Sequence, residues 1–267
     1  MLRKGDLTQG GITGTLLHFT LPMLVGSFLQ QCYNIADTLI VGQCIGAGAL
    51  AAVGSAYTLM VFLISVLLGL AMGSGTVFSL HYGAGNHVAL RRSIFSSFVL
   101  IGIVTLILNV AVFIWLGPIL RLLQVPQDIY GMMHSYLWII FCGIVFTFIY
   151  NFYASLLRAV GDSVTPLWFL AVSVVLNIAL DLFFILQLDW GIQGAAAATV
   201  LAQGVAALGI IIYTYRRRPE LRWHHEDMCF DRTCLKEIAS FSTLTCIQQS
   251  VMNLGILMVQ GLVNSFG

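Results

Sequence analysis

The chain has 267 residues, of which 59% are hydrophobic and only 9% are charged. Soluble domains carry roughly 45–50% apolar and about 25% charged residues, so this composition excludes a soluble globular protein. The formal net charge of +1 is informative only through the positions of the charges, and no nucleic-acid partner is expected.

Seven segments are long and apolar enough to cross a bilayer. A crossing helix needs about 20 apolar residues, because the hydrocarbon core is about 30 Å thick and each residue rises about 1.5 Å. In chain order the segments are 16–45, 51–80, 93–116, 130–157, 166–186, 192–215 and 238–266. Pro22 in the first segment is expected to bend it and is the candidate hinge. Gly69 and Gly73 in the second fit the GxxxG pattern of close helix packing.

The basic residues are distributed very unevenly between the two ends of these segments. Since Lys and Arg are retained in the cytoplasm, the richer end is expected to be cytoplasmic. The poorer end holds only Arg121. The richer end holds Arg3, Lys4, Arg91, Arg92, Arg158, Arg216, Arg217, Arg218, Arg222, Arg232 and Lys236. The sequence therefore predicts a multi-pass protein of the cytoplasmic membrane with its N-terminus in the cytoplasm.

Two acidic residues, Asp37 and Asp181, fall inside the apolar segments. A carboxylate at the centre of a membrane helix costs roughly 2.5–3.5 kcal/mol on insertion scales, so each needs a partner, a bound cation or a proton. Asn177 lies four residues before Asp181 and shares its helical face. This segment is the most informative in the chain, because a buried acid indicates function.

Polar residues of three segments are expected at one depth. Counting from the outer ends at about 1.5 Å per residue places Asp37, Asp181 and Thr199 about 8–12 Å into the membrane. The predicted site for coupling a small cation or a shared proton comprises Asp37, Asn177, Asp181 and Thr199. Supporting polar residues at helical spacing are Gln30, Asn34 and Gln203. The alternative interpretation is a structural polar network that stabilises the bundle.

The polar stretch 216–237 is the predicted boundary between two bundles. The seventh segment resembles the first at an offset of 222 residues, for example Phe19 with Phe241. The predicted organisation is therefore a six-helix lobe (1–215), a cytoplasmic linker (216–237) and the first helix of a second lobe (238–267). His224, His225, Cys229 and Cys234 have no standard zinc spacing, so no transition metal is expected.

Several stretches resemble one transporter family. They are LPMLVGSFLQQCYNIADTLIVG in the first segment, HYGAGN from His81, LLRAVGDSVTP at 156–166, and NIALDLFFI followed by GIQGAAAATVLAQ in the fifth and sixth. Together they resemble the multidrug and toxic compound extrusion (MATE) family of secondary transporters. The first-lobe cation site of that family is similar to Asp37, Asn177, Asp181 and Thr199 here.

The resemblance implies an all-α polytopic membrane protein, with a six-helix transmembrane lobe plus a seventh span as half of a twelve-helix, two-lobe transporter. It also implies export of organic, often cationic compounds by antiport with Na⁺ or H⁺, without a further cofactor. Five more helices would follow Gly267, so the chain is expected to be a fragment or a truncated product. Phe152, Tyr153 and Met60 are expected to line the substrate pocket.

Two other functions, a flippase and a membrane enzyme, fit the sequence less well than multidrug efflux. A flippase for lipid-linked precursors or polysaccharides, from the same superfamily, would need a strongly cationic cavity, and the predicted segments hold no Lys or Arg in their interiors. A membrane enzyme would need a catalytic set near an interface, and none is visible. The expected partners are a small-molecule substrate and membrane lipid, and the sequence indicates no oligomeric state.

Overall fold

The protein is described here by a computed structural model, which covers residues 12–122, 125–223, 227 and 232–265. The elements in chain order are α1 (Ile12–Cys44), α2 (Ala47–Gly83), α3 (His87–Leu122), α4 (Gln127–Cys142), α5 (Ile144–Ala159), α6 (Val164–Leu182), the π-helical turn η1 (Phe183–Gln187), α7 (Gly191–Arg217), the 3₁₀ turn η2 (Pro219–Leu221) and α8 (Arg232–Ser265). The described chain is helical in every element, as the sequence predicts.

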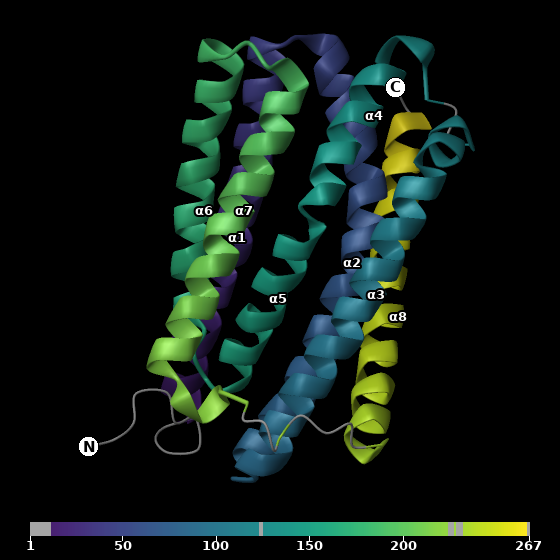
Figure 1. Cartoon of the computed structure of the whole chain (residues 1–267). Helices are drawn as coiled ribbons and strands as arrows, with labels where there is room; N and C mark the ends of the chain where they lie inside the picture. Colours follow the sequence, from purple (N-terminus) through teal and green to yellow (C-terminus); the bar gives the residue numbers. More distant parts are fainter. Residues whose placement is uncertain (1–11, 123–124, 224–226, 228–231, 266–267) are drawn as a thin grey trace.

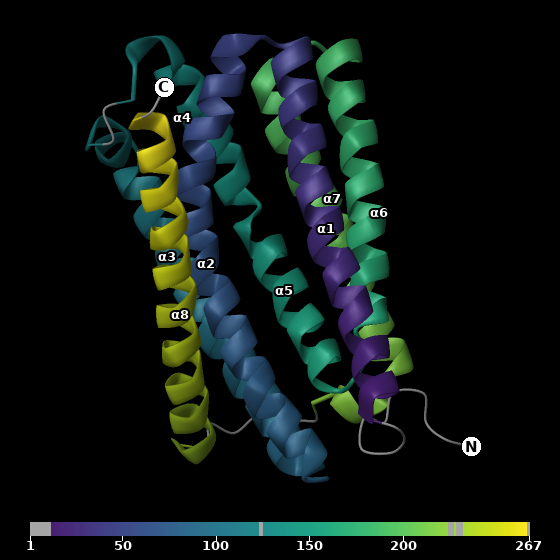
Figure 2. The same ribbon diagram turned by 180° about the vertical axis from the view of Figure 1, so that it is seen from behind.

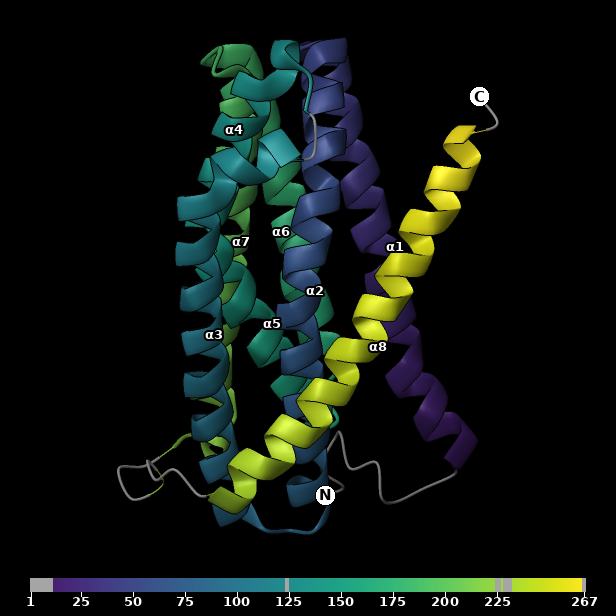
Figure 3. The ribbon, with the colours of Figure 1, turned by 90° about the vertical axis from the view of Figure 1, so that its right-hand side faces the viewer.

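The helices form one elongated bundle with α5 near its middle. Helices α1, α6 and α7 lie on one side, whereas α2, α3 and α8 lie on the other (Figure 1; Figure 2, from behind). Helix α8 crosses the face of α2 obliquely, and the first part of α1 leans away from the other helices (Figure 3). Helices α1 and α7 both contact α6, so the three segments that carry buried polar residues lie side by side.

Among the described residues, four helices meet a criterion of length and hydropathy for crossing a membrane, or five if the bent pair α4 and α5 counts as one. The four single helices that meet it are α2, α3, α6 together with η1, and α7. Helices α1 and α8, also predicted to cross, do not meet it, although they are 33 and 34 residues long. Their polar side chains, such as Gln31 and Asp37 in α1, lower the mean hydropathy. Thus the membrane-crossing, all-helical prediction is confirmed, and the division into six helices plus one stays a prediction.

The fourth predicted span is not one continuous helix. It breaks at Gly143 into α4 and α5, whose axes differ by 48°. A Cβ at Gly143 would lie 2.7 Å from Cγ1 of Val200 on α7, so only glycine allows this approach. The periodicity of apolar residues does not reveal such a break, because both halves are apolar.

Two turns at the end of the bundle that holds Gly85 and Gly161 are built in the same way. Gly85 and Gly161 adopt positive φ angles of 69° and 86°, which glycine accepts without strain. The next residue in each turn caps the following helix: Asn86 Oδ1 accepts a hydrogen bond from the Ala89 amide, and Asp162 Oδ1 from the Thr165 amide, both at 3.0 Å. These turns fix where α3 and α6 begin.

Helix α8 packs against α2 through glycine, as the GxxxG pattern predicts. A Cβ at Gly73 would lie 2.6 Å from the Ser242 backbone nitrogen, and one at Gly69 would lie 2.7 Å from Cys246 Sγ. Ser242 Oγ also donates to the Leu70 carbonyl at 3.3 Å. The backbones of α2 and α8 are therefore in close contact.

The segment after α7 packs onto the start of α3. Trp223 meets Phe95 and Phe98 with ring centroids 5.9 and 5.4 Å apart. Arg91 on α3 forms a 2.6 Å ion pair with the buried Asp227. The linker predicted at 216–237 is therefore held against the bundle, its last residues already belong to α8, and His224, His225 and Cys229 lie outside the described residues.

Replacing Trp223 by alanine is expected to lower the free energy of unfolding by about 2 kcal/mol, because Trp223 loses two aromatic contacts while being only partly buried. Unfolding of the detergent-solubilised chain in SDS measures the change. Trp168→Ala is the matched control, since Trp168 is 68% exposed and should change stability by less than about 0.5 kcal/mol. Equal losses in the two variants would contradict the packing role.

Candidate ion site and solute cavity

Asp37 on α1 and Asp181 on α6 face each other inside the bundle. Their carboxyl groups are close enough to interact electrostatically, and Asp181 has no exposed surface. In the described part of the chain, one oxygen of each, Oδ1 in both cases, is buried without a hydrogen-bond partner. Two carboxylates at this distance repel one another strongly in a low-dielectric site, so a cation or a proton must offset the charge.

Asn177 and Thr199 complete the predicted set around the acid pair. In the amide orientation that satisfies both neighbours, Asn177 donates to Asp181 Oδ2 at 2.9 Å and accepts from the Thr199 backbone amide at 3.2 Å. Both side chains are buried. The structure therefore brings together all four residues of the predicted ion site, from α1, α6 and α7.

Two tyrosines belong to this cluster and were not predicted. The Tyr33 hydroxyl lies 3.3 Å from Thr199 Oγ1, and Tyr136 on α4 is buried close enough to interact electrostatically with both carboxyl groups. Tyr33 lies four residues before Asp37, so helical spacing could have indicated it. Nothing in the sequence around Tyr136 indicates its position, because it depends on how α4 packs.

The cluster has the chemistry of a site for a hard cation or a proton. Carboxylate, amide and hydroxyl oxygens are the ligands that such cations prefer. The unpartnered oxygens of Asp37 and Asp181 supply the charge, and Thr199 and Tyr33 supply neutral oxygens. In a purely structural network both oxygens of each carboxylate would be expected to have partners, because most buried polar atoms in proteins are hydrogen-bonded.

The π-helical turn η1 begins two residues after Asp181. In this turn the Leu188 amide bonds to the Phe183 carbonyl at 3.3 Å, and Trp190 stacks on Phe184 with centroids 5.1 Å apart. Such turns are rare and frequently occur at functional positions. Here the turn ends α6 immediately beyond the buried acid.

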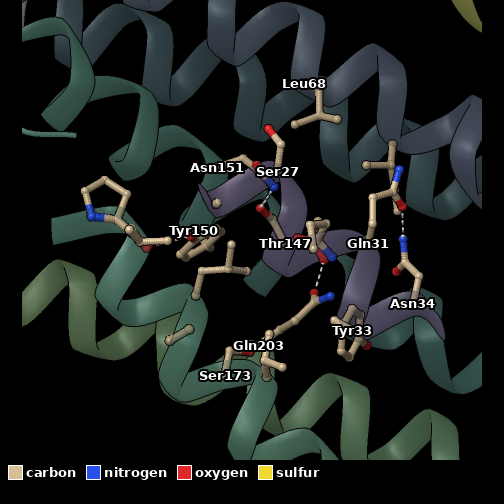
Figure 4. Close-up of a pocket in the computed structure, with 18 of the residues that line it drawn as sticks. Ser27, Gln31, Tyr33, Asn34, Leu68, Thr147, Tyr150, Asn151, Ser173 and Gln203 are labelled. Carbon is tan, nitrogen blue, oxygen red and sulfur yellow. Dashed lines mark hydrogen bonds between the residues drawn. The ribbon is translucent and has the colours of Figure 1, made fainter. Parts of the chain in front are cut away.

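A cavity of about 650 Å³ lies beside the acid cluster, between α1, α2, α5, α6 and α7. The predicted supporting residues Gln30, Asn34 and Gln203 lie on its wall, as does the candidate hinge Pro22, rather than at the acid pair. Gln203 accepts a hydrogen bond from Thr147, and Asn34 donates to Gln31 at 3.2 Å (Figure 4). The volume lies within the range of small-molecule sites.

Tyr33 and Thr199 belong both to this cavity wall and to the acid cluster. They separate the cavity from Asp37 and Asp181, neither of which lines it. Any change at the ion site that moves these two side chains therefore alters the cavity directly.

The residues that were expected to line the substrate pocket do not line this cavity. None of Phe152, Tyr153 and Met60 lines the cavity. Phe152 is fully buried against Phe78 and Phe98, at centroid distances of 5.9 and 5.3 Å. Tyr153, also on α5, contacts Phe98 on α3 at a centroid distance of 6.5 Å, and Met60 on α2 packs against the hydrophobic core.

Membrane-crossing helices, a buried acid pair and an adjoining cavity define a multi-pass membrane protein with a cavity of solute size among its helices. The MatE family model matches residues 22–183, more than half of the chain. The chain belongs to this family.

Curated relatives and solved structures agree with this assignment. The chain is 32% identical to "Probable multidrug resistance protein YpnP" of Bacillus subtilis, over 100% of the chain and 59% of the relative. It is 31% identical to "Multidrug export protein MepA" of Staphylococcus saprophyticus, over 76% and 45%. A structure of MATE in the bent conformation superposes with a TM-score of 0.91 at 23% identity, covering 100% of this chain and 60% of that one. The chain thus matches between 45% and 60% of the length of these proteins.

Proposed function

We propose that the protein is a multidrug efflux antiporter of the cytoplasmic membrane, with its N-terminus in the cytoplasm. Na⁺ or H⁺ entering the acid pair drives export of small organic compounds from the cavity. The observation that carries this proposal is the juxtaposition of Asp37 and Asp181, each with an unpartnered buried oxygen. The names of the relatives from Bacillus and Staphylococcus support the substrate class.

The coupling follows from the shared wall between site and cavity. A cation or proton at Asp37 and Asp181 changes the charge that faces Tyr33 and Thr199. A conformational change requires a ligand that binds two states differently, and this charge change supplies the difference. Pro22, which lacks a backbone donor inside α1 and lines the cavity, is the proposed hinge.

The proposed organisation keeps residues 1–215 as the first lobe, 216–237 as a cytoplasmic linker and 238–267 as the first helix of a second lobe. Three arginine–carboxylate ion pairs at one end of the described bundle support this end as the charged, cytoplasmic one. The flippase alternative would need several cations on the cavity wall, and one is present among the described residues.

The experiment is ethidium efflux from proteoliposomes that contain the protein, under an imposed gradient of Na⁺ or H⁺. The expected result is that one gradient accelerates efflux at least about tenfold over liposomes with no gradient. Collapsing that gradient with monensin for Na⁺, or with a protonophore for H⁺, should return the rate to its basal value. An efflux rate that is the same with and without each gradient would contradict ion coupling.

A further inference from the structure

The cavity wall has a single charged side chain among its described residues, the cation Arg158. No Asp or Glu lines it, because the acid pair lies behind Tyr33 and Thr199. The sequence predicts that Arg158 is one of the basic residues at the cytoplasmic end. The structure instead places it at the end of α5, partly buried and on the wall of the cavity.

Within the described part of the chain, the Arg158 guanidinium forms no ion pair and no hydrogen bond. The neighbouring acids are already paired: Asp162 and Glu220 both contact Arg218, at 3.3 and 3.6 Å. The hydroxyl of Tyr150, which lines the same cavity, donates to the Pro166 carbonyl at 3.0 Å. Arg158 therefore has its donors available to a molecule in the cavity.

A structural role explains part of this arrangement. A cation near a helix C-terminus is stabilised by the helix dipole, and basic residues enrich cytoplasmic ends. Both effects would be satisfied by an arginine pointing to water, as Arg216 and Arg217 do at the end of α7. Neither effect explains an unpaired guanidinium on a cavity wall.

The charge and length of the cavity indicate what kind of ligand would fit it. Arg158 lies eleven residues from Thr147 on α5, which corresponds to about 16 Å along the bundle. The wall also has apolar side chains, such as Met23, Leu167 and Leu170, beside polar ones such as Asn151. Amides and hydroxyls dominate the far end, including Gln203 and Tyr33. The complementary molecule is amphiphilic, with an anionic group at one end and an apolar body.

We propose that Arg158 binds the carboxylate of an amphiphilic substrate, so that the cavity selects zwitterionic or anionic compounds over purely cationic ones. Arginine is suited to this role because its planar guanidinium binds a carboxylate through two parallel hydrogen bonds. The inference rests on the proposed export function, whose substrate class it narrows.

The experiment compares two dyes that differ by one methyl group: rhodamine 110, with a free carboxylate, and rhodamine 123, its methyl ester. Fluorescence polarisation measures the binding of each to the purified protein in a neutral detergent. The expected result is tighter binding of rhodamine 110. Arg158→Gln should weaken it about tenfold and leave rhodamine 123 unchanged, because the charge-assisted pair is lost. Arg158→Lys should retain part of the preference.

Arg217→Gln is the matched control, since it removes the same charge from an exposed position outside the cavity wall. It should leave both affinities unchanged. Equal weakening of both dyes by Arg158→Gln, or no weakening of either, would overturn the proposal. Displacement of rhodamine 110 by phosphatidylglycerol would also overturn it, by assigning Arg158 to a lipid phosphate.

The outcome is separable from that of the ion-coupling experiment. Gradient-driven ethidium efflux without any preference for rhodamine 110 would contradict only the carboxylate site. A preference for rhodamine 110 that depends on Arg158, without gradient-driven efflux, would contradict only the coupling.

Discussion

Asp181→Asn is expected to abolish ion-driven efflux, reducing the gradient-dependent rate by at least about a hundredfold. Asparagine has nearly the same shape but cannot carry the charge that attracts a cation or holds a proton. Because Asp181 is fully buried and already accepts a bond from Asn177, the neutral amide should leave the fold intact. Asp37→Asn should have the same effect. Ethidium efflux from proteoliposomes under the driving gradient measures both variants.

The matched control is Asp189→Asn, at an exposed carboxylate beyond α6. Asp189 has a φ of 53°, a conformation that asparagine also accepts, so this variant should transport at the wild-type rate. Undiminished efflux from either acid-pair variant would remove these two residues from the coupling mechanism.

Gly73→Leu is expected to destabilise the chain by about 3 kcal/mol, through forced separation of α2 from α8. A side chain at this position meets the backbone of Ser242, which cannot rotate away as a flexible side chain could. The measurement is the SDS concentration that unfolds the detergent-solubilised chain, with limited proteolysis to report exposure of α8.

Gly54→Leu is the control on the same helix, because an added Cβ there meets no atom within 4 Å. It should leave stability unchanged or slightly raised, since leucine favours helix more than glycine does. If both leucine variants unfolded at the same SDS concentration, the close approach of α2 and α8 would not be a source of stability.

The convergence of the acid pair could be predicted because depth in a membrane is nearly one-dimensional. The ends of each span are visible as breaks in the apolar pattern, and a fixed rise per residue then places Asp37, Asp181 and Thr199 at one level. Whether side chains at one level also face one another depends on helix rotation, for which the sequence offers only the spacing of Asn177 and Asp181. The role of these residues in ion coupling stays a prediction.

The parts that could not be predicted depend on where helices bend and end. The break at Gly143 is set by its approach to Val200, a residue of another helix, and apolar periodicity does not register it. Beyond the break, Phe152 is buried in the core and does not line the cavity. Arg158 appeared to belong to a loop because a charge usually marks the end of a span, whereas α5 continues to Ala159.

The break at Gly143 divides the fourth predicted span into two helices that contribute to different sites. Helix α4 contributes Tyr136 to the acid cluster, whereas α5 contributes Thr147, Tyr150 and Arg158 to the solute cavity. Because the two halves have separate axes, substitutions along α5 can reshape the chamber without rotating the tyrosine beside the carboxyl groups. Substitutions along α5 are therefore expected to alter the cavity while they leave the residues of the acid cluster in place.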